Sequence, residues 1–356
     1  MPVVPASLRL ILTVLLSFAL GSCGTVEYYS QAAHGQYEIL HGAKPIEEVE
    51  AEPSTPKELR QQLELIRHLR EFARDHLDLT AQKQFGTYRD LQRPYVLWNV
   101  YAAPEFSTEA KSWWYPLIGS AKYRGYFSID QAKASEKHLK GEGNDVFVAG
   151  IRVYSTLGWF HDPVLNTFVD ADEANLAETL FHELAHARVF VSGDTDFNEA
   201  FATAVGEEGV RRWFRSQGRL KDLREYERSL VQERRVLHLL QAARSQLDNL
   251  YAGKDNMPVE ELRRRKEAVF EKLRADYRAM KRHGLAGDKH DYWFDARLNN
   301  ARLATVDSYH GLVPAFARLL QKDGSDFSKF YADVAAMKSL TKDQRRERLN
   351  EGAPQQ

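Results

Sequence analysis

The sequence predicts an α+β fold that is predominantly α-helical, and three observations support this expectation. Apolar residues recur at helical spacing in long segments before residue 80 and after residue 170. Between them, residues 85–160 contain short runs of β-branched and aromatic residues that are bounded by turn residues, which is typical of strands. The charged region 219–283 repeats leucine every seven residues, which indicates paired helices. We therefore expect a small sheet within a mainly helical chain.

The composition is that of an ordinary globular protein. The chain has 356 residues, of which 43% are hydrophobic and 28% are charged, and its formal net charge is −1. This length allows one large domain with an insertion or two modest domains. A net charge so close to zero provides no electrostatic basis for binding nucleic acid, so we expect no nucleic-acid partner.

The first 22 residues have the pattern of a signal peptide, in which Arg9 precedes an apolar run that is too short to cross a bilayer comfortably. The run ends in Leu20-Gly-Ser-Cys23, which resembles the lipobox of bacterial lipoproteins. Cys23 is the only cysteine of the chain, and its lipidation would anchor the protein to a membrane. By resemblance to Gram-negative lipoproteins, Gly24 favours the outer membrane, facing the periplasm. An ordinary signal peptide with an incidental cysteine is the alternative.

Residues 23–56 are expected to form the lipidated N-terminus and a linker, because their later part combines several prolines with an acidic patch. The aromatic residues Tyr28 and Tyr29 suggest that the start of this segment docks on the domain. An amphipathic helix is expected from Pro56 to about Leu79.

The strand-rich region predicts a small sheet just before residue 170. Strands are expected at 95–101, 123–128 and 146–154, with a helix at 128–140. The segment from Arg152 to Phe160 is our candidate for the edge strand of this sheet, and an edge strand can bind an extended ligand by main-chain hydrogen bonds. Trp159 and Phe160 are candidates for lining a substrate cleft, and packing in the core is the alternative for both.

The pattern His182-Glu183-Leu184-Ala185-His186 stands in an expected helix over residues 170–190, which Asp170 and Glu173 would begin as a capping box. Residues four apart lie on one face of a helix, so both imidazoles can bind one metal ion. Glu183 is placed to hold a water molecule bound to that ion. A pair of histidines with a purely structural role is the alternative.

Glu199 is the candidate for a third metal ligand. It follows a turn at 192–196 and stands near the start of a second expected helix that opens at Phe197. A catalytic zinc ion takes three protein ligands and leaves one position for water. Because Asp196 and Glu199 also have capping-box spacing, Glu199 could instead cap its helix. Glu207 and Glu208, two turns further on, are the reserve ligand candidates.

The stretches Phe181–His186 and Phe197–Gly209, together with Tyr154–Phe160, Tyr123–Phe127 and the lipoprotein-like start, resemble a bacterial lipoprotein family of predicted zinc-dependent aminopeptidases. The absence of glycine and histidine at residues 189 and 192 excludes the metzincin pattern, and the remainder resembles a gluzincin, in which glutamate is the third zinc ligand. Four residues after Glu199 stands Thr203, where thermolysin-like enzymes often carry an aspartate that supports a metal-binding histidine.

This resemblance covers most of the mature chain and implies a zincin-like catalytic core over residues 57–345, with its small sheet placed before the metal helix. It also implies a Zn²⁺ cofactor and a peptide substrate. Zincins use a downstream donor to stabilise the oxyanion. Tyr309 and His310 are the candidates here, Asn299 and Asn300 are weaker ones, and a packed aromatic role is the alternative for Tyr309.

Residues 219–283 are expected to form an antiparallel coiled-coil hairpin inserted in the catalytic domain. Leu223, Leu230 and Leu237 recur every seven residues, and a Gly/Asp/Asn/Pro turn precedes a second apolar repeat. The charged residues favour a solvated face, and a surface that binds a protein partner is the alternative. The polar residues 346–356 are expected to form a disordered tail.

The sequence therefore predicts a zinc metallopeptidase in which Glu183 acts as the general base. The narrower hypothesis is an aminopeptidase, with Glu178, Glu207 and Asp162 as candidate carboxylates for the free amine of the substrate. An endopeptidase of the cell envelope with the same mechanism is one alternative. A non-catalytic lipoprotein scaffold that uses the coiled-coil hairpin and a structural zinc ion is the other.

Overall fold

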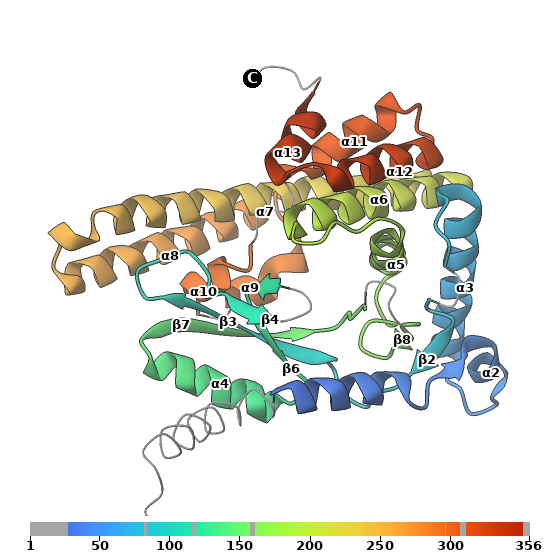
Figure 1. Ribbon diagram of the computed structural model, residues 1–356, viewed down its shortest axis with the longest axis horizontal. Helices are drawn as coiled ribbons and strands as arrows, with labels where there is room; N and C mark the ends of the chain where they lie inside the picture. The colour runs from blue at the N-terminus through green and yellow to red at the C-terminus, as the bar shows by residue number, and fades with distance from the viewer. Residues whose placement is uncertain are drawn as a thin grey trace, which may run out of the picture.

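The computed structural model in Figure 1 describes residues 28–81, 84–115, 119–156, 161–295, 297–306 and 311–351. Within these ranges the chain is mostly helical with small sheets, so the expected α+β, predominantly helical fold is confirmed. The largest apolar core joins the N-terminal helices, the two helices around residues 173–216 and the C-terminal helices. No helix of the described ranges is both long enough and apolar enough to cross a membrane.

The segment 28–56 is not an open linker, which corrects our expectation. Residues 28–40 are helical and are followed by β1 (Lys44–Pro45) and α2 (Ile46–Ala51). Ile39, Ile46 and Val49 are buried in the main core, and the burial of these apolar side chains stabilises the packing of the segment against the domain. The ring of Tyr28 packs against those of Tyr115 and Tyr126, so the expected docking of this aromatic end is found.

The expected helix after Pro56 is α3 (Lys57–Leu77). It buries one apolar face and ends at Asp78, which adopts the left-handed conformation with φ of 50°. In Figure 1 this helix stands at one end of the molecule, beside α5 and α6. Its buried residues are Leu63, Ile66, Leu69, Phe72, Ala73 and Leu77.

The main sheet has the strand order β6 (Arg124–Tyr126), β3 (Leu97–Pro104) and β7 (Asn144–Ile151), and all its pairs are antiparallel. The register pairs Leu97 with Ile151 and Pro104 with Asn144. Helix α4 (Ile129–Gly141) lies across this sheet and forms a small core with it. The described residues also form two minor sheets, namely β1, β2 (Thr87–Arg89) and β8 (Val164–Leu165), and the pair β4 (Trp113–Tyr115) and β5 (Gly119–Ala121).

The candidate edge strand at 152–160 is wrong in its described part. Strand β7 ends at Ile151, and residues 152–156 form no strand. The side chain of Arg152 instead donates hydrogen bonds to the carbonyl of Thr167 and to Asp170, which connects it to the segment before the next helix. Trp159 and Phe160 lie outside the described residues.

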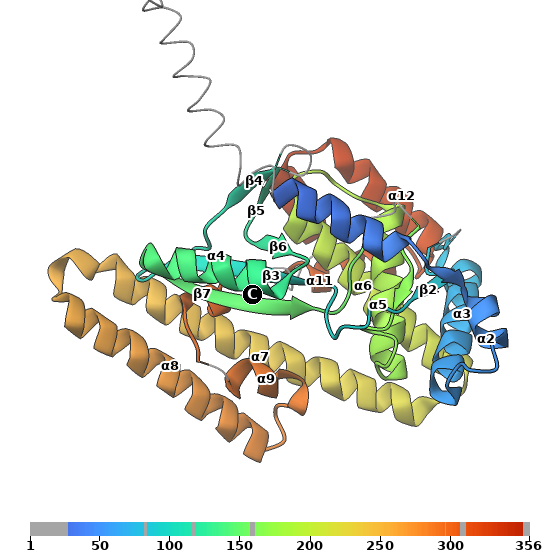
Figure 2. The same ribbon diagram turned by 90° about the horizontal axis from the view of Figure 1, so that it is seen from below.

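The helical hairpin is confirmed as α7 (Leu220–Ala252) and α8 (Val259–Arg282), which pack side by side with Leu240, Leu247, Phe270 and Leu273 buried between them. Figure 2 shows α7 running from beside α3 to the opposite end of the molecule, where the chain turns back as α8. The apolar cluster of the hairpin also contains Trp293 and Leu303, which belong to the following segments. A protein partner for the exposed charged face remains a prediction.

The C-terminal part consists of α9 (Asp291–Asp295), α10 (Asn300–Leu303), α11 (Val313–Lys322), α12 (Phe327–Ala336) and α13 (Lys342–Asn350). The expected disordered tail is wrong for residues 346–350, which belong to α13. This helix starts with a capping box between Thr341 and Gln344 and buries Leu349. Its Arg345 reaches Asp194 in the main core region, and these local and distant contacts together hold the end of the described chain.

Candidate metal centre

The helix that carries both histidines is α5 (Glu173–Arg188), and its start differs from the expected one. Asp172 caps it by accepting a hydrogen bond from the amide of Asn175 at 3.0 Å. Asp170 is instead paired with Arg152, so it forms no capping box. Glu173 binds the indole nitrogen of Trp213 at 2.7 Å, which fixes this end of α5 to the next helix.

The next helix is α6 (Thr195–Ser216), which Asp194 caps by accepting from the amide of Phe197. Asp194 is itself buried and ion-paired with Arg345 at 2.7 Å. Asp196 lies inside the helix and pairs with Lys342, so the capping-box alternative for Glu199 is wrong. The side chain of Glu199 is therefore available for another role.

The loop between the two helices is closed by Asn198, which the sequence analysis did not single out. The side-chain Nδ2 atom of Asn198 donates to the backbone carbonyl of Val191 at 2.7 Å. The side-chain Oδ1 atom of Asn198 accepts from the backbone amide of Val191 at 2.8 Å. Gly193 in this loop has a φ of 79°, a conformation that side chains rarely adopt. These bonds fix the backbone immediately before Glu199.

Helices α5 and α6 lie antiparallel and in close contact. Glu199 faces the histidines near the C-terminal end of α5, whereas Trp213 contacts Glu173 at its N-terminal end. Between these points, a Cβ atom at Gly206 would lie 3.0 Å from the carbonyl oxygen of Glu178. A Cβ atom at Gly209 would lie 2.4 Å from the ring of Phe181. The two glycines thus allow an approach that side chains would prevent, and their spacing on one helix face was a signal available in the sequence.

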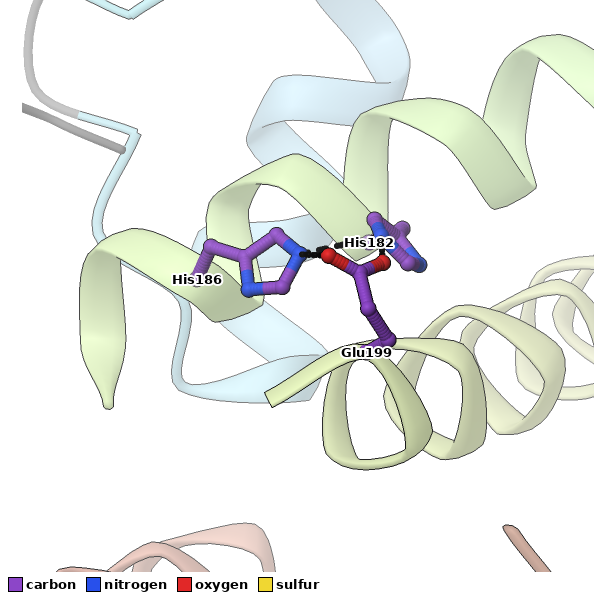
Figure 3. Close-up of side chains that lie close together, drawn as sticks. All are labelled: His182, His186 and Glu199. Carbon is purple, nitrogen blue, oxygen red and sulfur yellow. Dashed lines mark hydrogen bonds and ion pairs between the residues drawn. The ribbon is translucent and has the colours of Figure 1, made fainter. Parts of the chain in front are cut away.

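His182, His186 and Glu199 converge on one point, as Figure 3 shows. The Nε2 atoms of the two histidines lie 3.0 Å apart. Nε2 of His182 is 3.3 Å from Oε2 of Glu199, and Nε2 of His186 is 3.7 Å from Oε1. Two ligands at about 2.1 Å from a tetrahedral zinc ion would be separated by about 3.4 Å. The three distances lie on both sides of this value, so these residues can hold a metal ion of that size.

The charges of the three side chains are coupled. Burial opposes the charge of Glu199, but hydrogen bonds from His182 and His186 outweigh it and hold the pKa of Glu199 well below its usual range. Burial likewise acts against the charged form of His182, but its hydrogen bond to Glu199 and the nearby charge of Glu183 raise its pKa. Glu199 is therefore a carboxylate near neutral pH, which is the form that binds metals.

Access to this group is uneven. The side chain of His186 is only 3% exposed, while those of His182 and Glu199 are 21% and 35% exposed. A ligand can therefore approach from the side of His182 and Glu199. The buried Nδ1 atom of His186 has no hydrogen-bond partner among the described residues, so the group that would orient this ring is not found there, and Thr203 does not supply it.

The reserve ligands Glu207 and Glu208 do not join the group. Glu207 is buried and ion-paired with Arg211 at 2.9 Å and with Arg234 at 3.0 Å, and Glu208 pairs with Arg212. Glu207 thus connects α6 to its own next turn and to α7, whereas Glu208 is paired within α6. They are therefore not metal ligands in this structure.

Asp162 lies near Glu183 and is engaged by its own surroundings. Its carboxylate accepts from the amide of Thr156 at 2.8 Å and from the hydroxyl of Thr156 at 2.9 Å, and its backbone amide donates to Gln84. Burial raises the pKa of Asp162 despite these bonds, and the charge of Glu183 contributes to the rise. The two acids are thus close enough for their charges to interact.

The remaining candidates are placed as follows. Asn299 caps α10 and donates to the carbonyl of Val146, and Asn300 donates to the carbonyls of Pro104 and Glu105. Their amide groups are thus used for packing against the sheet, which corrects their proposed oxyanion role. Cys23, Tyr309 and His310 lie outside the described residues.

Comparison with known proteins identifies a family for this chain. A family model described as "Putative aminopeptidase" matches residues 27–349, which is most of the chain. No curated protein and no solved structure matches the chain.

Proposed function

Because the chain belongs to the putative aminopeptidase family, we propose that it is a zinc-dependent peptidase that removes residues from the N-terminus of peptides. The observation that carries the proposal is the convergence of His182, His186 and Glu199 at ligand distances from one another. Two imidazoles and one carboxylate, with one exposed side, are the donor set of a catalytic zinc site.

The zinc ion, when bound, would polarise both a water molecule and the carbonyl of the scissile peptide bond. Glu183 would take the proton of the attacking water and pass it to the leaving amine. Its position supports this role, because Glu183 directly follows the ligand His182 in the sequence. Its charge also contributes to raising the pKa values of both His182 and Asp162. His182, His186 and Glu199 would hold the metal and leave the region in front of Glu183 open to the substrate.

Metal analysis is the experiment that tests the zinc site. Purified protein is expected to contain one zinc ion per chain and to lose peptidase activity after chelation. The Glu199→Gln variant should bind zinc more weakly while its metal-free form remains folded, which circular dichroism checks. A variant of a remote acid on the same helix, Glu208→Gln, serves as the matched control. Full activity of the metal-free protein would contradict the proposal.

The amino-acyl preference is tested separately. The protein is offered reporter substrates with a free N-terminal amine and the same substrates with an acetylated N-terminus. We expect cleavage of the free-amine series. Cleavage of only the acetylated series would establish the alternative of an envelope endopeptidase, and retained zinc without any cleavage would favour the scaffold alternative.

We also propose that the protein is a lipoprotein of the outer membrane that faces the periplasm, with the lipid on Cys23. The signal-like residues 1–22 and the single cysteine support this. Expressed with its leader, the protein should incorporate labelled palmitate and sediment with membranes. The Cys23→Ser variant should do neither, and unchanged membrane association of this variant would contradict the proposal.

A further inference from the structure

We propose that Glu178 binds the free α-ammonium group of the substrate and thereby makes this enzyme an aminopeptidase. This inference rests on the proposed function and adds to it the residue that recognises the chain end. Glu178 is one of three carboxylates that the sequence offers for this task, and the contacts of the three differ sharply.

Glu178 occupies the same face of α5 as the metal-binding histidines. Residues 178, 182 and 186 follow one another at intervals of four, so they form one row along the helix. At Gly206 of α6, a Cβ atom would lie 3.4 Å from Cγ of Glu178 and 3.6 Å from Cβ of His182. The side chains of Glu178 and His182 therefore both project from α5 next to Gly206 of α6.

The separation along this row suits the end of a peptide. The α-nitrogen of a residue lies about 2.5 Å from its own carbonyl carbon. One turn of helix is about 5.4 Å long. A hydrogen bond of about 3 Å from the ammonium group to Glu178 thus leaves the first carbonyl of the peptide within reach of the group formed by His182, His186 and Glu199.

Glu178 has one carboxylate oxygen without a donor among the described residues, whereas Glu207 is already ion-paired and both carboxylate oxygens of Asp162 accept hydrogen bonds. Its Oε2 atom accepts from the hydroxyl of Tyr226 at 3.0 Å, and no described residue donates to Oε1. Glu207 is engaged by two arginines, and Asp162 accepts bonds from Thr156.

The surrounding charges fit an added positive group. Burial raises the pKa of Glu178, and the charges of Glu233 and Glu207 add to this, while Lys289 and Tyr226 oppose it. The amino group of Lys289 is bonded to Glu233 at 2.8 Å, so this cation is held by another partner. A substrate ammonium would supply a cation bonded directly to Glu178, whose carboxylate forms no ion pair with any described residue.

The kinetic test compares Glu178→Gln with the wild type on leucyl and N-acetyl-leucyl reporter amides that are otherwise identical. We expect kcat/KM for the free-amine substrate to fall about 10- to 100-fold, which is typical of losing a charged hydrogen bond, and kcat/KM for the acetylated substrate to stay unchanged. Zinc content and melting temperature should match the wild type. Equal effects on both substrates, or none on either, would overturn the proposal.

A binding test works without turnover. The zinc-loaded Glu183→Gln protein is titrated with the dipeptide Leu-Gly and with N-acetyl-Leu-Gly by calorimetry, and the Glu178→Gln change is then added. Only the affinity for Leu-Gly should fall.

If the enzyme proves inactive on every substrate, the proposed function fails, but this titration still decides the role of Glu178. If Glu178→Gln fails to fold, the variant Tyr226→Phe replaces it, because this change removes only the hydroxyl that donates to Glu178. We then expect a smaller loss of affinity, and only for the free-amine ligand. An equal loss of affinity for both ligands would reject the assignment.

Discussion

Nε2 of His182 and Oε2 of Glu199 lie 3.3 Å apart, although the two residues belong to different helices. This distance depends on the glycines that bring α5 and α6 together and on Asn198, which holds the loop between them. It gives the chain a preformed donor set, whose consequences for metal binding, catalysis and stability can be measured.

Removing the base should separate metal binding from turnover. In Glu183→Gln the three donor residues are intact, so zinc content should equal that of the wild type. Activity should fall roughly 10³-fold, as expected when a general acid–base group is lost. The measurement is kcat/KM on a free-amine reporter beside zinc analysis of the same sample. Wild-type activity in the zinc-loaded variant would remove Glu183 from the mechanism.

Zinc affinity should fall at low pH. Metal binding requires neutral imidazoles, so a proton on His182 competes with the ion. The pKa of His182 is raised in the metal-free protein, mainly because Glu199 outweighs the effect of burial, so the affinity should decline as pH decreases through this raised value and protons should be released on binding. Titration with zinc at several pH values in two buffers of different ionisation enthalpy measures both effects. An affinity independent of pH would contradict the assignment.

The same coupling predicts how the metal-free protein responds to pH. A histidine whose pKa is raised on folding stabilises the fold below its unfolded pKa, and this contribution is lost as pH rises through the folded value. Denaturant unfolding of the metal-free protein should therefore show that the free energy of unfolding decreases as pH rises from the unfolded to the folded pKa of His182. This decrease should be smaller in the Glu199→Gln variant.

Adding one methyl group between the helices should disturb the site. In Gly209→Ala the new Cβ atom would meet the buried ring of Phe181 at 2.4 Å. Overpacking typically costs about 1–3 kcal/mol, which exceeds the gain of up to about 1 kcal/mol from better helix propensity. Gly141→Ala, where no atom lies within 4 Å, is the matched control and should be neutral or slightly stabilising. Chemical denaturation compares the two, and equal stabilities would show that the helices can separate freely.

The last helix should contribute strongly to stability through one ion pair. Asp194 and Arg345 are both nearly buried, and removing one partner of a buried pair costs about 3–5 kcal/mol. Arg345→Met should therefore lower the unfolding free energy by that amount and should also weaken zinc binding, because Asp194 caps the helix that carries Glu199. Arg348→Met, at an exposed position of α13, should change neither quantity. A small effect of Arg345→Met would place α13 outside the cooperative unit.

Local patterns predicted much of the fold and the central residues of the site. The spacing of four between His182 and His186 placed both on one helix face, and the repeat of seven predicted the hairpin α7–α8. Helix starts were less predictable, since two aspartates compete at each. Distant partners decide between them, because Arg152 takes Asp170 away from α5 and Arg345 fixes Asp194 at α6.

The segments expected to be a linker and a disordered tail were misjudged for a related reason. Each contains only a few apolar residues in a polar sequence, and composition alone gives them no place in a core. Ile39 and Ile46 are nevertheless fully buried, as is Leu349 to within a few per cent. The burial of such isolated apolar residues can be predicted only when the core residues that they pack against are known.

The pairing of Asp194 with Arg345 has a consequence for biosynthesis. The cap of the helix bearing Glu199 is completed by a residue translated 151 positions later. Until that stretch has left the ribosome, a nascent chain lacks the last support of its ligand-bearing helix. The cap of α6 therefore reaches its final form only after α13 has been synthesised.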